Sequence, residues 1–192
     1  MRLTRRAFSA GLLGVATSSL AGRASGAEPA RVLRAWYSLI LELVRQTPTY
    51  SPPVAARAFA YLGITTFEAV ASGSKALNSL AGQVKGLADV PQRKQGAAYD
   101  ETVIVHAAMA FAAQTYFFNT GPSGQRAMKA LEKKLHKQSA EGLAPGTWEE
   151  SAAHGKAVAE HIFAWSRQDG GAEVKNLGFP EDWQLTKGPA HW

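Results

Sequence analysis

The chain has 192 residues, 46% of them hydrophobic, which is enough for one domain with a packed core. It contains no cysteine, and this excludes disulfides, thiolate metal sites and cysteine nucleophiles. The formal charge of +6 suggests a nucleic-acid partner, but four arginines and no acid lie in residues 1–27, so the remaining 17 basic residues face 15 acidic ones. We therefore expect no nucleic-acid partner.

Residues 1–27 have the composition of an export signal. A charged start precedes a mildly apolar run, and Ser25 and Ala27 occupy the −3 and −1 positions that a signal peptidase requires. The pair Arg5 and Arg6 resembles a twin-arginine signal, and an ordinary secretory signal with a chance arginine pair is the alternative. The apolar run is shorter than the about 20 residues of a stable membrane span. We expect a periplasmic or secreted protein.

Two helices are predicted next. Residues 30–46 have apolar side chains at the i, i+3, i+4, i+7 spacing of an amphipathic helix. The motif TPTYSPP then interrupts the chain, because a residue before proline avoids the helical region. We expect Ser51 to cap a second helix over residues 52–72, with proline in its first turn. This helix is alanine-rich and nearly uncharged, as a central helix of a bundle would be.

The middle of the chain predicts three further segments. Residues 75–85 indicate a short helix, which is followed by a loop. Residues 100–118 predict a helix buried in protein, because no charged side chain occurs in residues 102–125. A membrane span is the alternative for this helix, but polar residues such as His106 argue against it. Residues 122–139 predict an exposed amphipathic helix.

The last predicted helix begins at the motif APGTWEES and ends at DGG. Thr147 and Glu150 have the spacing of a capping box at its start. Residues 173–192 show no periodicity, and no segment alternates as a strand would. The predicted fold is therefore all-α, a bundle of about five or six helices over residues 28–172 that is followed by an irregular tail.

Few side chains suggest catalysis or metal binding. His154 and His161 lie two helical turns apart and Glu150 lies one turn before His154, so this face is a weak candidate for a metal-binding bundle. We favour ordinary residues on a charged helix, because a di-iron bundle needs Glu-x-x-His on two helices and the chain has none. No serine-hydrolase elbow, P-loop or dinucleotide fingerprint occurs. We assign no catalytic, cofactor-binding or metal-binding residue.

One long segment, LELVRQTPTYSPPVAARAFAYLGITTFEAV, resembles the N-terminal helical region of bacterial vanadium-dependent haloperoxidase-like proteins. These belong to the phosphatidic acid phosphatase type 2 superfamily. The resemblance continues in ESAAHGKAVAEHIFAWSRQDGG and in NLGFPEDWQLTKGPAHW. It implies an all-α fold. In the family, vanadate in a C-terminal bundle helps hydrogen peroxide oxidise a halide, or the same pocket hydrolyses phosphate esters.

The family's oxyanion pocket is built from motifs of the form KxxxxxxRP, PSGH and SRxxxxxHxxxD, and none of them is complete in this chain. Gln125 replaces the histidine of the second motif, Ala172 stands where the third requires histidine, and no Arg-Pro dipeptide occurs. The resemblance therefore implies the scaffold half of the family, ending before the catalytic motifs. We expect no cofactor in this chain, vanadate being implied only for the full-length family, and no activity from this chain alone.

Two functions follow from these expectations. The first is an exported haloperoxidase-like scaffold domain that self-associates or binds a separately encoded catalytic half. The alternative is a stand-alone periplasmic helical binding or scaffold protein without catalysis. The first predicts exposed apolar surface. The helices at residues 52–72 and 100–118 are nearly uncharged and both need to be covered, and the few remaining segments cannot easily cover both.

Overall fold

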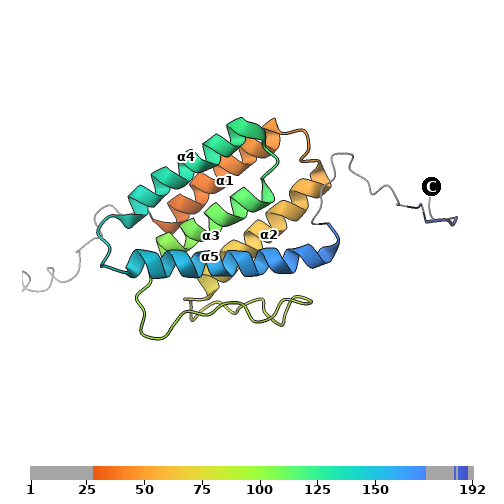
Figure 1. Ribbon diagram of the computed structural model, residues 1–192. Helices are drawn as coiled ribbons and strands as arrows, with labels where there is room; N and C mark the ends of the chain where they lie inside the picture. The colour runs from red at the N-terminus through yellow and green to blue at the C-terminus, as the bar shows by residue number, and fades with distance from the viewer. Residues whose placement is uncertain (1–27, 172–183, 185, 190–192) are drawn as a thin grey trace, which may run out of the picture.

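The computed structural model describes residues 28–171, 184 and 186–189, and these form a bundle of α-helices without a strand (Figure 1). The predicted all-α fold is therefore confirmed. Arg5, Arg6, Ala27 and most of the tail lie outside the described residues. The helices, in chain order, are α1 (Pro29–Gln46), α2 (Pro52–Ala71), α3 (Glu101–Tyr116), α4 (Gly121–Ala140) and α5 (Thr147–Ser166), with a 3-10 turn, η1 (Arg167–Asp169).

Helix α3 is the centre of the bundle and packs against α1, α2, α4 and α5 (Figure 1). Its start is capped by Asp100, whose carboxylate accepts hydrogen bonds from the backbone N–H groups of Thr102 and Val103. Eleven of its 16 residues are buried. An uncharged helix needs cover on every side, and four neighbouring helices provide it. The predicted burial of this segment in protein is confirmed.

The core has two parts, one on each side of α3. The larger part lies between α1, α2, α3 and α4, and the smaller lies between α2, α3, α5 and the loop that follows α2. The largest fully buried side chains of the larger part are Trp36, Ile40, Leu62, Met109, Phe117 and Met128. The smaller part includes Ala69, Leu87, Ile104, Val158 and Ile162.

Helix α2 begins at the two prolines as predicted, but Ser51 makes no capping hydrogen bond with its side chain. Within the described residues, α2 is the helix with the length and composition that a membrane crossing would require. Buried helices of water-soluble proteins meet the same criteria, so this finding is weak evidence for a span. Seven of the 20 residues of α2 are buried.

The helix predicted at residues 75–85 does not form. Residues 73–99, called the long loop from here on, run as turns and irregular backbone. Gly82 and Gly86 both have φ of 76°, a left-handed conformation that ends helical continuity and favours glycine. The buried carboxylate of Glu68 accepts hydrogen bonds from the backbone N–H of Leu80 (2.6 Å) and the hydroxyl of Ser79 (2.8 Å). Tertiary contacts therefore replace the local helical ones.

The start of α5 also differs from the prediction, because Thr147 and Glu150 form no capping box. The residue before the helix is Gly146 with φ of 80°, and Thr147 is already helical. Glu150 instead forms an ion pair with Lys94 of the long loop at 2.8 Å. The helix end agrees better with the prediction, since the chain leaves η1 at Gly170 with φ of 76°.

An ion pair joins α2 to the end of α5. The Arg57 guanidinium donates from Nε to Asp169 Oδ2 (2.7 Å) and from Nη2 to the Ser166 carbonyl (2.7 Å). The Tyr61 hydroxyl donates to the same Asp169 oxygen at 2.8 Å. Arg57 is the first cause that lowers the pKa of Asp169, from an ordinary value of 3.8 to about 2.

We expect the Asp169→Asn variant to lose stability relative to the parent protein at neutral pH but not at strongly acidic pH. A lowered pKa in the folded protein stabilises the fold above about pH 4, and this contribution is lost as the pH falls towards about 2. Urea unfolding at several pH values measures the difference. Glu42→Gln is the control, because Glu42 is exposed and pairs only within α1, with Arg45. A parent-to-variant difference that stays constant with pH would contradict the prediction.

Candidate functional site

Besides the ion pair of Arg57 and Asp169, polar side chains from several elements meet in two further places within the described residues. The first is a set of hydrogen bonds under the long loop, here called the loop network. The second is a hollow between α3, α4 and α5.

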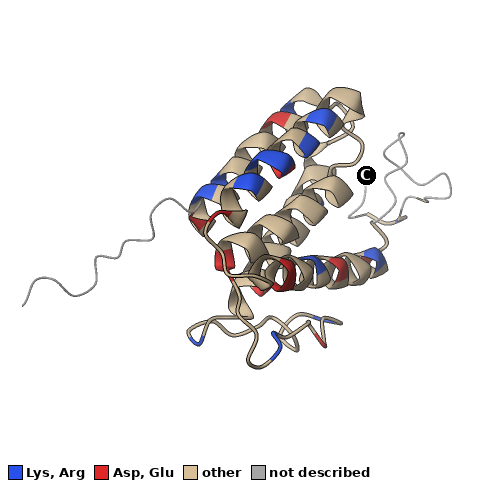
Figure 2. Ribbon diagram, turned by 60° about the vertical axis from the view of Figure 1, so that its left-hand side comes forward, with Lys and Arg blue, Asp and Glu red and all other residues tan. Residues whose placement is uncertain are grey.

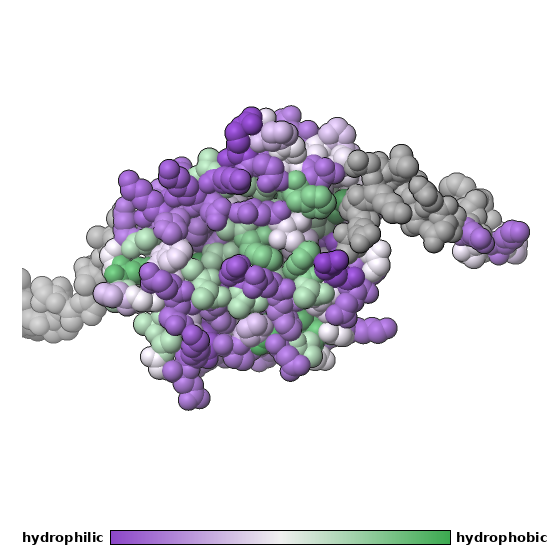
Figure 3. Space-filling model, in the orientation of Figure 1, coloured by the Kyte–Doolittle hydropathy of each residue, from purple (hydrophilic) through white to green (hydrophobic). Residues whose placement is uncertain are grey.

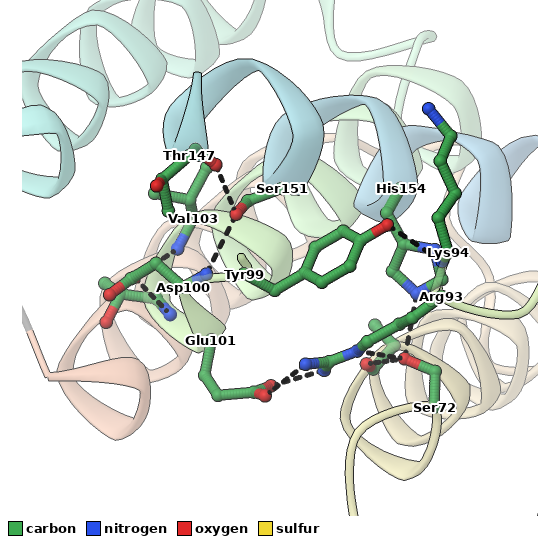
Figure 4. A network of polar contacts seen from close by, with 12 residues as sticks. Ser72, Arg93, Lys94, Tyr99, Asp100, Glu101, Val103, Thr147, Ser151 and His154 are labelled. Atoms are coloured by element: carbon green, nitrogen blue, oxygen red, sulfur yellow. Dashed lines mark hydrogen bonds and ion pairs between the residues drawn. The ribbon is translucent and has the colours of Figure 1, made fainter. Parts of the chain in front are cut away.

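The loop network joins α2, α3 and α5 through Arg93 of the long loop (Figure 4). Arg93 forms an ion pair with Glu101 at 2.7 Å and donates from Nε to the Ser72 hydroxyl at 3.2 Å. The same hydroxyl lies 2.8 Å from His154 Nε2. The guanidinium of Arg93 also lies over the ring of Tyr99. Arg93 thus links the long loop to α3 and to the end of α2, and Ser72 extends the network to His154 of α5.

The Ser72–His154 contact has the atoms of a nucleophile and its base, but the hydrogen bonds do not suit catalysis. The Ser72 hydroxyl also lies 2.8 Å from the Ala69 carbonyl, and its single proton satisfies that acceptor. His154 then donates to the serine and cannot take its proton. Burial, followed by the Arg93 charge, lowers the pKa of His154, while Glu101 opposes this change. We interpret the loop network as a structural anchor.

The side chains considered for a metal site are not brought together. The His161 ring lies 2.7 Å from the Ala88 carbonyl, His154 contacts Ser72, and Glu150 pairs with Lys94. Over residues 28–171, no group of three metal-binding side chains occurs. His161 and Glu150 hold the long loop to α5, and His154 joins α5 to the end of α2.

The hollow is an open cavity of about 460 Å³ between the middle and second half of α3, the second half of α4 and the first half of α5. Its apolar walls are formed by small residues and by the ring of Phe111. The small residues are Ala107, Ala110, Ala152 and Ala153. In the space-filling view, patches of apolar surface lie between hydrophilic regions on the face toward the viewer (Figure 3).

His106 is the most buried polar residue that lines the hollow, with 3% of its surface exposed. The Trp36 indole N–H donates to its Nδ1 at 3.4 Å, and the two rings are stacked. Burial, and then the nearby His136, lowers the pKa of His106 to about 4, so the ring is neutral at pH 7. Because Nδ1 accepts, the proton lies on Nε2, for which the described residues supply no acceptor.

The rim of the hollow is polar and aromatic. Gln114 donates its amide to Glu132 at 2.7 Å, and the rings of His136 and Trp148 are 4.3 Å apart. The Trp148 indole N–H is buried, and it has no hydrogen-bond partner among the described residues. Aromatic faces and unused donors therefore meet at the hollow.

Sequence reasoning missed this site because its histidines share no motif. His106 and His136 come from different helices and are 30 positions apart. The one available signal was a histidine within an otherwise uncharged helix, which served only as an argument against a membrane span. Helix packing brings the two residues to one hollow.

Charge is also distributed unevenly over the surface, and cations gather on the α4 edge of the bundle (Figure 2). Helix α4 contains five basic residues and a single acid, Glu132. The basic residues, all exposed, are Arg126, Lys129, Lys133, Lys134 and Lys137. Overall charge balance in the sequence conceals this one-sided distribution.

The chain is similar to the crystal structure of a bacterial vanadium-dependent iodoperoxidase, at 30% sequence identity and a TM-score of 0.65. The match covers 85% of this chain and 38% of that one, so the chain spans less than half of the iodoperoxidase. No protein-family model and no curated protein matches the chain. The helical bundle therefore has a haloperoxidase-like fold.

Proposed function

We propose that the chain is an exported, haloperoxidase-like helical scaffold domain that carries no oxyanion site of its own. The observation that carries this proposal is the structural match, which extends over most of this chain but over 38% of the iodoperoxidase. The arrangement of the cations supports the proposal that the chain carries no oxyanion site. An oxyanion site needs several converging cations, whereas Arg57, Arg93 and Lys94 are each paired with a carboxylate.

We expect the purified chain to show neither peroxide-dependent iodide or bromide oxidation with added vanadate nor hydrolysis of a phosphate ester. The physical reason is that the five cations of α4 are exposed and none of them lines the hollow, so no group of cations converges on a histidine in a pocket of the described residues. Halide oxidation is measured by triiodide or tribromide absorbance, with free vanadate as the control. Turnover that saturates with vanadate and exceeds the free-vanadate rate would refute the proposal.

The surface that a partner would cover lies on α2. Helix α3 is covered by its neighbours inside the bundle. Of the two nearly uncharged helices, only α2 can therefore expose apolar surface to a partner. The two charged side chains of α2 do not face a partner, because Glu68 is buried and Arg57 pairs with Asp169. A stripe of uncharged residues remains exposed or partly exposed along the helix, formed by Pro53, Ala56, Ala60, Gly63 and Phe67.

We propose that this stripe contacts a second copy of the chain or a separately encoded catalytic half. Burial of apolar surface contributes roughly 25 cal/mol per Å², so a contact along a helix of this length favours association. Ala60→Glu places a charge in the stripe at an exposed position and should shift the chain towards monomer in sedimentation. Ala164→Glu, at an exposed position of α5, is the matched control.

A parent chain that is a monodisperse monomer and binds no dye for apolar surface would contradict self-association. It would favour the alternative, a stand-alone periplasmic helical binding protein, which the hollow between α3, α4 and α5 supports.

Export is a further part of the proposal and is supported by Arg5 and Arg6. Replacing both with lysine should retain the precursor in the cytoplasm, and undiminished export would exclude the twin-arginine route.

A further inference from the structure

We propose that the hollow between α3, α4 and α5 binds a small neutral aromatic molecule that carries a carbonyl or hydroxyl oxygen. Its volume of about 460 Å³ lies within the range of about 300–1,000 Å³ that is usual for small-molecule sites. Alanine side chains leave room for a planar ring, and Phe111, His136 and Trp148 supply aromatic surface at the wall and rim.

The oxygen atom of the ligand is required by His106. This side chain is 97% buried, its Nδ1 accepts from Trp36, and its Nε2–H lacks an acceptor within the described residues. Water can reach this N–H in the open hollow, but a ligand that fills the hollow excludes that water. A ligand without an acceptor would then leave the donor unpaired, at a cost of about 1–3 kcal/mol, and a ligand oxygen avoids that cost. A carbonyl or hydroxyl group is an acceptor of suitable size.

The charges around the hollow favour a neutral ligand. The titratable groups that line it are His106 from α3, Glu132 and His136 from α4, and Glu149 and Lys156 from α5. An anion would meet the carboxylates of Glu132 and Glu149, while Lys156 already pairs with Glu160 at 3.4 Å. A cation would meet the N–H donor of His106. A neutral molecule avoids both conflicts.

Two probes of nearly equal shape test the role of the oxygen. Acetophenone has a carbonyl acceptor, and ethylbenzene has a methylene group in the same position. We expect saturable binding of both by ligand-observed NMR, with acetophenone about fivefold to tenfold tighter. Equal affinities, or no saturable binding below about 10 mM, would overturn the proposal.

Two variants locate the binding. Ala153→Trp fills the hollow from an exposed position and should abolish binding of both probes, whereas Ala164→Trp, exposed on the same helix but outside the hollow, should leave it unchanged. His106→Phe keeps a ring but removes the donor, and it should eliminate the preference for acetophenone. Circular dichroism checks that each variant is folded. Binding that survives Ala153→Trp would place the ligand elsewhere and refute the site.

Discussion

Substitution of Gly155 by alanine is expected to destabilise the protein by about 3 kcal/mol, because the added methyl group has no room. Gly155 lies where α5 crosses α3, and a Cβ atom there would clash with the Ile104 carbonyl oxygen and lie 3.1 Å from the Ile104 Cα. These are backbone atoms, so no side chain can rotate away to relieve the contact. The two helices would have to separate.

Gly63→Ala in α2 is the matched control and has the opposite expected sign. A Cβ atom at Gly63 would have nothing within 4 Å, and alanine is the better helix former by about 1 kcal/mol. Urea unfolding followed by circular dichroism compares both variants with the parent protein. Equal stability of the Gly155→Ala variant and the parent would show that α3 and α5 do not approach this closely.

Removal of the Glu68 carboxylate should have the second large effect. Glu68 is 1% exposed, and its two oxygens accept hydrogen bonds from Ser79 and Leu80. Glu68→Ala leaves a cavity and a Leu80 N–H without its acceptor, for an expected loss of about 3 kcal/mol. Amide hydrogen exchange should accelerate across the long loop, because the hydrogen bonds of Glu68 hold the first part of this loop against α2.

Two further variants separate the anchor from general effects of charge. Glu68→Gln keeps an acceptor for Leu80 and offers an N–H to the Ser79 hydroxyl, so we expect a loss of only about 1 kcal/mol. Lys94→Ala removes the exposed pair with Glu150, for which we expect little change in stability because solvent screens the two charges. If Glu68→Ala and Lys94→Ala changed stability and amide exchange equally, Glu68 would not be the anchor of the loop.

The helices of this protein could be predicted because their signals are local. Periodic apolar residues mark α1, two prolines mark the start of α2, and the uncharged run of α3 indicates burial on all sides. Asp100 is a residue type that commonly caps the start of a helix, and it directly precedes α3. Gly170 is a residue type that commonly ends a helix, and it directly follows η1. Resemblance of the α2 region to haloperoxidase-like proteins agreed with the fold that the structure shows.

The local signals failed where a distant partner competed for the same group. The long loop contains a plausible helical pattern, yet hydrogen bonds from Ser79 and Leu80 to the buried Glu68 replace that helix. Glu150 has the spacing of a capping box but pairs with Lys94, 56 positions away. A sequence pattern contains no information about such a competitor until the chain is folded.

The all-α class, five helices and the incomplete oxyanion motifs could be predicted from the sequence, because each depends on residues close together in the chain or on the presence of a residue type. The surfaces and side chains that meet could not be predicted in this way and follow from the packing of the helices. This packing brought His106, His136 and Trp148 to one hollow, covered α3 and left a stripe of α2 uncovered. These features depend on how helices separated in sequence pack against one another, and helical periodicity does not specify that packing.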